Sequence, residues 1–137
     1  MDHSQISLQK QQARKQAKQV RKHLHENQRN IAAQHLLRFA PDLIDKFTSS
    51  IVAGFLPIFT EIDIIPLMTA LAEKHCQLCL PVTPEKPSAL CFRAYAPGQE
   101  LEAGPLNTKH PDASSNQLIP ELVLLPLLAF DMRYNRL

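Results

Sequence analysis

The chain has 137 residues, of which 45% are apolar and 20% are charged, as in a globular protein and not in a disordered one. This length fits one domain, and we expect residues 1–137 to form a single one. Gly54, Gly98 and Gly104 are widely spaced, which excludes a Walker loop and a dinucleotide-binding fingerprint, since both need clustered glycines. Any phosphate site is therefore built from side chains or lies beyond the last residue.

The net charge of +2 hides an asymmetry along the chain. Residues 1–30 hold seven Lys and Arg against two acids, a net +5, and residues 31–137 give −3. A basic segment on a mildly acidic body indicates an anionic ligand or partner, or only a solvated surface.

The cysteines and the apolar runs indicate the compartment. There are three cysteines, and residues 1–30 contain no apolar stretch of the kind that a signal peptide needs. The longest apolar run, residues 122–130, is far shorter than a membrane span and contains Pro126. We therefore expect a reducing cytoplasm, free thiols and no membrane association.

Residues 4–39 have the pattern of a long basic helix. Apolar residues recur at helical spacing, no Gly or Pro interrupts them, and Pro41 is expected to close the helix. A break near Asn27–Asn30 would divide it in two. Four cationic side chains follow at i, i+4, i+8 and i+11 and line one face, which we call the basic stripe. Its members are Lys10, Arg14, Lys18 and Arg21.

The rest of the chain alternates apolar strands with helices. Strands are expected over 51–56, 77–82, 89–95 and 122–125. Helices are expected over 43–47 and 64–75, the second capped by Asp63. Its inner face consists of Ile65, Leu67, Met68 and Leu71. Residues 96–120 contain four prolines and read as an irregular connection. This order predicts an α/β fold, with a three-layer, mostly parallel sheet and flanking helices.

The basic stripe has three interpretations. Lys10 and Arg14 lie one turn apart and can hold one phosphate group, the Arg as a fork and the Lys as a point charge. A solvated helix face and a nucleic-acid-binding surface are the alternatives. Nucleic-acid binding ranks last, because no aromatic residue precedes Phe39 and single-strand binders combine charge with stacking rings.

Two further features can carry chemistry. Glu61 follows the first strand, and ligands of open α/β sheets lie outside the carboxyl ends of the strands. A carboxylate there can accept two hydrogen bonds from an amino-heterocycle, or simply belong to a polar loop. Cys76 and Cys79 have metal-like spacing, but no second pair completes a zinc site. We expect Cys79 to point into the buried sheet and expect no metal site.

The C-terminal stretch, residues 120–137, resembles the signature of the 5-formyltetrahydrofolate cyclo-ligase family. That signature reads P-x-L-A-F-D-x-x-G-x-R-L after a strand and is followed by a glycine-rich G-x-G-x-G-Y-Y-D. The pair Lys10-x3-Arg14 and the run Phe55-Leu-Pro-Ile-Phe-Thr-Glu61 agree with the family in order and spacing. The resemblance covers about residues 10–137.

The resemblance implies a reaction and site residues. The family closes 5-formyltetrahydrofolate to 5,10-methenyltetrahydrofolate with ATP and Mg²⁺: the formyl oxygen is phosphorylated, the neighbouring ring nitrogen attacks, and phosphate leaves. Lys10, Arg14 and Arg136 match residues that contact ATP, and Leu56 and Glu61 match residues that hold the folate. It implies no catalytic side chain and no metal ligand within this chain.

The chain departs from the family in three places. Tyr134 stands where the family has Gly, Leu127 stands where many members have Gly, and the sequence ends where the glycine-rich loop would begin. We therefore expect an amino-terminal part of a cyclo-ligase that is weak or inactive alone. Its last strand would be covered by a missing C-terminal segment or by oligomerisation. The alternative is a degenerate, non-catalytic homologue that binds nucleotide, folate or a protein partner.

Overall fold

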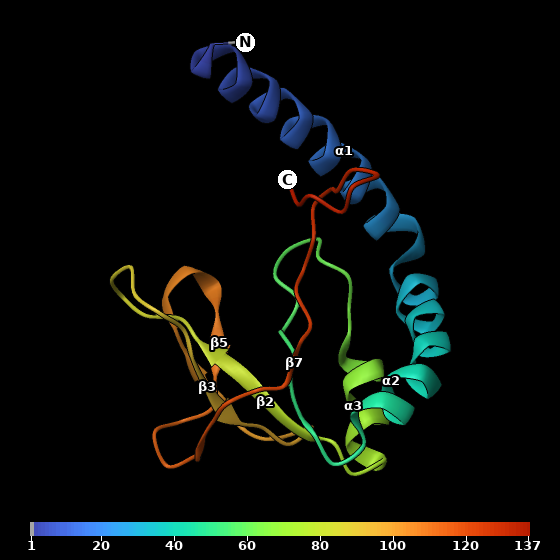
Figure 1. The fold of residues 1–137 in the computed structure, drawn as a ribbon, viewed down its shortest axis with the longest axis vertical. Helices are drawn as coiled ribbons and strands as arrows, with labels where there is room; N and C mark the ends of the chain where they lie inside the picture. The colour runs from blue at the N-terminus through green and yellow to red at the C-terminus, as the bar shows by residue number, and fades with distance from the viewer. Residues whose placement is uncertain (1) are drawn as a thin grey trace.

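The computed structural model describes residues 2–137. Its helices are α1 (His3–Leu36), α2 (Ala40–Phe47) and α3 (Ile65–Glu73), with 3-10 turns η1 (Leu37–Phe39) and η2 (Pro105–Asn107). Its strands are β1 (Ile51–Ala53), β2 (Gln77–Val82), β3 (Cys91–Ala94), β4 (Glu102–Ala103), β5 (Lys109–His110), β6 (Gln117–Leu118) and β7 (Leu122–Val123). Figure 1 shows α1, the long basic helix that the sequence predicts, reaching away from a body of sheet and helices.

Five strands form one sheet in the order β6-β3-β2-β1-β7. The central strand β1 pairs in parallel with β2 and with β7, whereas β3 is antiparallel to both β2 and β6. Only β3 is therefore reversed, and the sheet is mixed but mostly parallel, which confirms the predicted α/β class. The strands β4 and β5 pair with each other in a separate two-stranded sheet.

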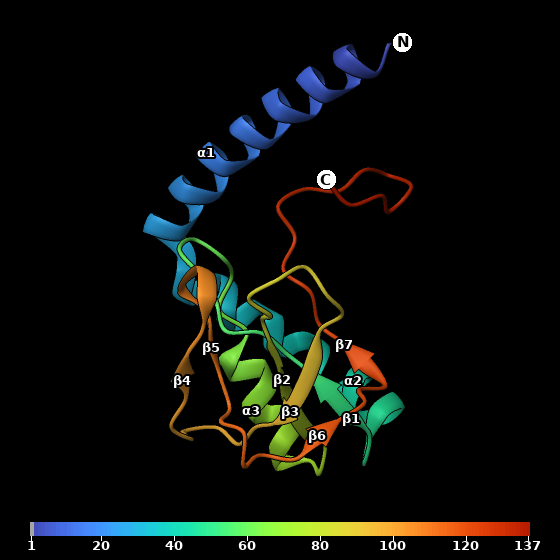
Figure 2. The ribbon, with the colours of Figure 1, turned by 90° about the vertical axis from the view of Figure 1, so that its left-hand side faces the viewer.

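The core lies between the sheet and the helices. Its buried residues are Ala40, Val52, Phe55, Ile64, Leu67, Met68, Leu71, Cys76, Leu78 and Leu80. On β1 and β2 the paired residues Ala53 and Cys79 point to the opposite face and are also fully buried. Figures 1 and 2 show the helices on one side of the sheet, so residues 2–137 form two of the three expected layers.

Gly54 brings helix α3 close to the end of β1. A Cβ at Gly54 would overlap the Sδ and Cε atoms of Met68, whose side chain is 1% exposed. The absence of a side chain therefore lets α3 pack directly on the strand end, which leads into the loop that carries Glu61.

The expected break at 27–30 is wrong, because α1 is continuous from His3 to Leu36, although Figure 1 shows that it bends part way along. The side-chain amide of Asn27 donates to the carbonyl oxygen of His23 at 2.7 Å, so this Asn bonds back onto the helix. Pro41 does not close this helix either. It lies in the first turn of α2, where its missing N–H costs nothing.

The strand bounds differ from the prediction in several places. Strand β2 occupies its expected residues, but the other three expected strands are shorter, since their ladder pairing ends after two to four residues. Helix α3 is also shorter than expected, and Ile65 is 38% exposed instead of facing inward. Residues 96–120 contain β4, β5 and β6, whose two-residue length leaves no periodic pattern to detect.

Candidate functional site

The loop at the carboxyl end of β1, residues 57–63, is held by its own side chains. The carboxylate of Glu61 accepts a hydrogen bond from the backbone N–H of Ile58 at 2.9 Å, and the Glu61 N–H donates to the Ile58 carbonyl at 3.1 Å. At the other end, Asp63 Oδ1 accepts from the backbone N–H of Ile65 at 2.9 Å, although the N-cap of α3 is Ile64 and not Asp63 as predicted. Each carboxylate is therefore fixed by a backbone donor.

Helix α1 is joined to this 57–63 loop by Arg21, whose Nε donates to the hydroxyl oxygen of Thr60 at 3.1 Å. Because Arg21 belongs to the basic stripe, the inner end of the stripe lies beside the loop that carries Glu61. Lys10 and Arg14 lie further out, exposed, on the part of α1 that projects from the body. Figure 2 shows that β1 and β7 point toward the same end of the molecule.

Leu56 and Glu61 lie on different sides of Pro57. Leu56 lines a mostly apolar hollow of about 350 Å³ together with Ile65 of α3 and Leu80 of β2. We call it the apolar hollow, and its remaining lining residues are Phe55, Pro57, Ile58, Pro81, Thr83, Asn107, Thr108 and Lys109. Asn107, Thr108 and Lys109 come from residues 96–120, the connection that was expected to be irregular.

Glu61 lines a second hollow of about 320 Å³ between α1 and the 57–63 loop, which we call the polar hollow. Its lining residues are His25, Arg29, Asn30, Pro57, Phe59, Glu61 and Asp63. Pro57 lines both hollows and separates them. Leu56 and Glu61, the two residues that the family resemblance assigns to the folate, are therefore close in the sequence but line different hollows.

Positive charge on α1 is largely free of carboxylate partners. Among residues 2–137 one ion pair occurs, between Lys22 and Glu26 at 4.0 Å. Arg14 lines an open hollow of about 450 Å³ along α1 with three lysines, and Lys10 lies outside it. These lysines are Lys15, Lys18 and Lys22. The arrangement can attract an anion without first breaking an internal salt bridge.

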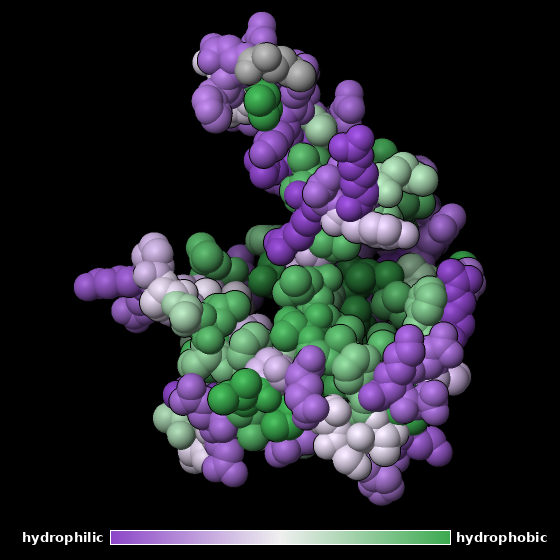
Figure 3. All heavy atoms as spheres, in the orientation of Figure 1, coloured by the Kyte–Doolittle hydropathy of each residue, from purple (hydrophilic) through white to green (hydrophobic). Residues whose placement is uncertain are grey.

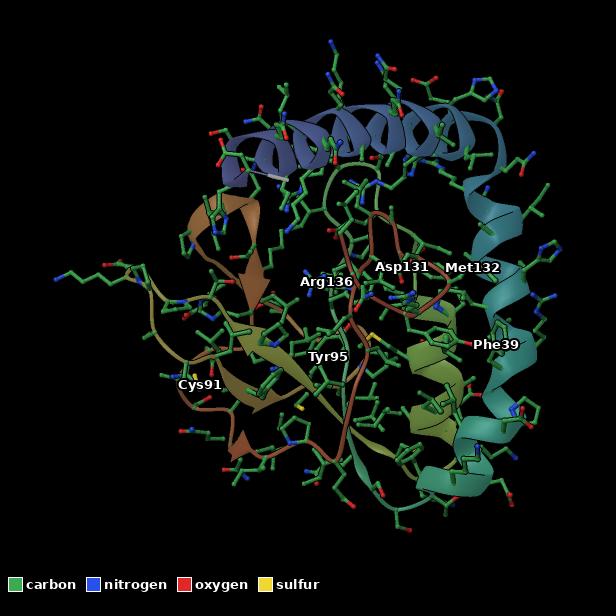
Figure 4. The ribbon with its side chains drawn as sticks, turned by 45° about the horizontal axis from the view of Figure 1, so that its top comes forward. Phe39, Cys91, Tyr95, Asp131, Met132 and Arg136 are labelled. Atoms are coloured by element: carbon green, nitrogen blue, oxygen red, sulfur yellow. The ribbon has the colours of Figure 1, made fainter. Side chains whose placement is uncertain are left out.

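Arg136 belongs to a C-terminal hairpin in which it is bridged to Phe130. Asp131 organises the turn by accepting hydrogen bonds from the backbone N–H groups of Arg133 and Asn135 and from the Asn135 side-chain amide. The bonds from Asn135 lower the pKa of the Asp131 carboxyl. Figure 4 shows Asp131 and Arg136 on this hairpin, on the side of α1 that faces the body. Arg136 does not line the hollows of Arg14, Leu56 or Glu61.

Tyr134 and Leu127, the two residues that depart from the family pattern, differ in backbone conformation and in surroundings. Tyr134 has a φ of +63°, the left-handed conformation that glycine adopts at low cost, so a bulky residue occupies a position suited to Gly. Leu127 lines a hollow of about 300 Å³ with Arg21 and Leu24 of α1 and Thr60. Its side chain therefore sits where α1, the 57–63 loop and the C-terminal segment meet.

Cys76 and Cys79 are core residues, as expected for Cys79, whereas Cys91 is only partly buried. Burial raises the pKa of the Cys79 thiol to about 11 and also raises that of Cys76, whose Sγ lies 3.3 Å from the Phe47 carbonyl oxygen. In the described part of the chain, no group of three or more His, Cys, Asp or Glu side chains is arranged to hold a metal ion. Nor is any helix of residues 2–137 long and apolar enough to span a membrane.

Sequence reasoning missed several residues around Glu61. His25 and Arg29 follow Arg21 at i+4 and i+8 and so lie on the same face of α1. This spacing extends the basic stripe toward Glu61 and could have identified them. Phe59 stands inside the family-like run 55–61, yet only the structure shows that this residue is 80% exposed.

Comparison with known proteins gives two findings. The family model of the 5-formyltetrahydrofolate cyclo-ligase family matches residues 6–137. The NMR structure of Aquifex aeolicus 5,10-methenyltetrahydrofolate synthetase is similar, with a TM-score of 0.71 and 22% sequence identity over 90% of this chain and 63% of that one. The chain thus spans less than two thirds of that protein's length and shares its fold. No curated protein matches.

Proposed function

The chain belongs to the 5-formyltetrahydrofolate cyclo-ligase family, and from this premise we propose that it takes part in the ATP-dependent closure of 5-formyltetrahydrofolate to 5,10-methenyltetrahydrofolate. The observation that carries the proposal is the family match over residues 6–137, almost the whole chain. The free thiols are compatible with a reducing cytoplasm, where we place the reaction.

Lys10, Arg14 and Arg136 are assigned to the phosphates of ATP. In the reaction, ATP supplies the phosphoryl group that activates the formyl oxygen. Phosphoryl transfer depends mainly on positioning and on charge stabilisation, so cations without internal carboxylate partners suit this task. The connection of α1 to the 57–63 loop through Arg21 supports the assignment, because it ties the basic stripe to the loop that carries Glu61.

Leu56 and Glu61 are assigned to the folate. The Glu61 carboxylate gives one oxygen to the Ile58 N–H and keeps the other for the N–H groups of a heterocycle. A carboxylate fixed in this way can orient a ring, and we do not assign it a proton-transfer step. Leu56 supplies apolar contact from the neighbouring hollow.

Magnesium does not fit a site made by this chain. Residues 2–137 bring together no set of three potential ligands, so they do not provide a cage for the ion. Mg²⁺ commonly keeps several waters and binds through substrate phosphates, and we assign it to the ATP polyphosphate only.

The second candidate function is a non-catalytic homologue that binds nucleotide, folate or a protein partner. It is favoured by the sheet edge, since β7 lacks a neighbour on its outer side within residues 2–137. Exposed apolar side chains continue from this edge along the chain, namely Val123, Leu125, Leu127 and Phe130. Figure 3 shows apolar residues gathered over the middle of the same face. A further segment or a second subunit would cover such an edge.

The test is to follow methenyl-folate formation by its absorbance after mixing the chain with 5-formyltetrahydrofolate, ATP and Mg²⁺. Slow ATP-dependent product, formed far below the rate of an intact family member and lost when ATP is replaced by a non-hydrolysable analogue, is the expected result. Binding of ATP and folate without any product would favour the second candidate. Absence of both binding and turnover would contradict the catalytic role and the binding of nucleotide or folate, and would leave only the binding of a protein partner.

A further inference from the structure

The polar hollow contains charges of both signs that do not meet. Arg29 of α1 and the carboxylates of Glu61 and Asp63 line the same space, yet the one ion pair found within residues 2–137 lies elsewhere, between Lys22 and Glu26. The backbone N–H groups of Ile58 and Ile65 instead bond to the carboxylates of Glu61 and Asp63. The hollow therefore offers an anchored acceptor and a separate cationic donor.

Phe59 adds an aromatic ring to this hollow. Its φ of +54° is the left-handed conformation, which is unfavourable for a bulky side chain, and the residue is 80% exposed. Core packing therefore does not explain this conformation. Phe59 lies inside the turn that the Glu61 N–H closes onto the Ile58 carbonyl oxygen at 3.1 Å, and Arg21 bonds to the next residue, Thr60. Strained residues of this kind gather at ligand sites.

We propose that the polar hollow binds the flat heterocyclic end of the substrate, and that Arg29 and Phe59 position it together with Glu61. Glu61 accepts from the ring N–H groups, Arg29 donates to the ring carbonyl oxygen, and Phe59 stacks against the ring plane. A volume of about 320 Å³ lies at the lower end of the range of small-molecule sites. This inference rests on the proposed function, because the ring is the 2-amino-4-oxo heterocycle of a folate.

Arg29 gives the hollow a means of discrimination that Glu61 lacks. A guanidinium can only donate hydrogen bonds, so it matches a 4-oxo group and opposes a 4-amino group, which also donates. Glu61 accepts from the 2-amino group, which both rings carry, and from N3–H, which only the 4-oxo ring carries, but it does not contact the substituent at position 4 itself. The identity of the substituent at position 4 is therefore read by Arg29.

The test compares two ligands on the whole chain by calorimetry: 5-formyltetrahydrofolate and a 2,4-diamino analogue with an amino group at position 4. The measured quantity is the ratio of the two Kd values. Arg29→Gln should shift this ratio about tenfold toward the diamino ligand, because a carboxamide can either donate or accept. Lys46→Gln, which removes an exposed cation on α2, should leave it unchanged. An unchanged ratio in Arg29→Gln would overturn the role of Arg29.

Phe59 is tested by two substitutions with different backbone consequences. Phe59→Gly removes the ring and suits the positive φ, so its Tm should equal or exceed that of the unsubstituted chain while folate affinity falls about tenfold. Phe59→Tyr keeps a stacking ring and should keep the affinity within about threefold. Unchanged affinity in Phe59→Gly would show that the ring does not contact the ligand.

The outcomes separate this inference from the proposed function. Folate binding that depends on Glu61 but on neither Arg29 nor Phe59 contradicts the inference alone. Absence of folate binding to the unsubstituted chain contradicts the inference and the folate assignment together. Binding that depends on all three residues without turnover supports the inference and contradicts the catalytic role.

Discussion

The Nε atom of Arg21 donates a hydrogen bond to Thr60 Oγ1 at 3.1 Å, across 39 positions of sequence. This contact ties the long α1 helix to the loop that follows β1. It determines which face of α1 looks toward Glu61, and therefore where Lys10 and Arg14 of the same stripe are directed. The orientation of Lys10 and Arg14 depends on this polar contact together with the apolar packing of the last turns of α1.

The contact between Arg21 and Thr60 should be measurable by a double-mutant cycle. Arg21→Ala, Thr60→Val and the double variant should give a coupling free energy of about 0.5–1.5 kcal/mol in urea unfolding, as for a partly buried hydrogen bond. The same cycle with exposed Lys22 in place of Arg21 is the control. Additive effects of Arg21→Ala and Thr60→Val would show that the two side chains do not interact in solution.

Gly54→Ala should destabilise the fold by about 1–3 kcal/mol, because the new methyl group overlaps the fully buried side chain of Met68. Met68→Ala makes room, so Gly54→Ala should cost less in that background. Chemical denaturation of the four chains measures the difference. Equal costs in both backgrounds would show that Met68 is not the obstacle.

Stability should fall between pH 9 and pH 11 through Cys79. Burial holds the thiol pKa at about 11 in the folded chain, against an ordinary value of 9.0, so the unfolded chain loses this proton first. The folded state then binds more protons than the unfolded one, and the free energy of unfolding decreases as pH rises through this window. Cys79→Ala should weaken the decrease in urea titrations; an identical pH profile would contradict the assignment.

Lys10→Ala and Arg14→Ala should weaken ATP binding, each by about tenfold if a phosphate contact is lost. Lys46→Ala on α2 removes the same charge elsewhere and should have little effect. Titration with a labelled ATP analogue and with a single-stranded oligonucleotide, at two salt concentrations, separates the interpretations of the stripe. Tight, salt-sensitive oligonucleotide binding without ATP binding would favour a nucleic-acid surface.

Glu61→Gln should weaken folate binding by about 1–3 kcal/mol with little change in Tm, because the Gln oxygen can still accept from the Ile58 N–H. Exposed Glu73 at the end of α3 provides the matched control, Glu73→Gln. Calorimetry measures affinity, and turnover is followed in parallel wherever product forms. A large loss of turnover at unchanged affinity would assign Glu61 to the chemical step.

The fold class could be predicted from particular segments of the sequence. The apolar run at 77–82 and the helix after Asp63 were found because buried strands and amphipathic helices leave periodic patterns. The pairs β4–β5 and β3–β6 were not found, since two-residue strands are defined by their partners. The break expected at 27–30 failed because polar residues that usually end helices are tolerated inside a long one.

For the candidate site, the sequence supplied the family, the basic stripe and the residues Leu56 and Glu61 as candidates. Their roles, with that of Arg136, stay predictions, as does the single domain. The sequence did not indicate that Leu56 and Glu61 face different hollows, nor that Arg29 and Phe59 share the space beside Glu61.

The sequence by itself determined the long basic helix, the α/β class and the family, because helical spacing, buried runs and motif order are local properties of the chain. Only the tertiary structure decided which side chains share a space. Arg29 and Phe59 lie 30 positions apart, and they meet because α1 packs against the 57–63 loop. Contacts of this kind depend on how elements dock, which is set by the summed burial of many side chains and not by local pattern.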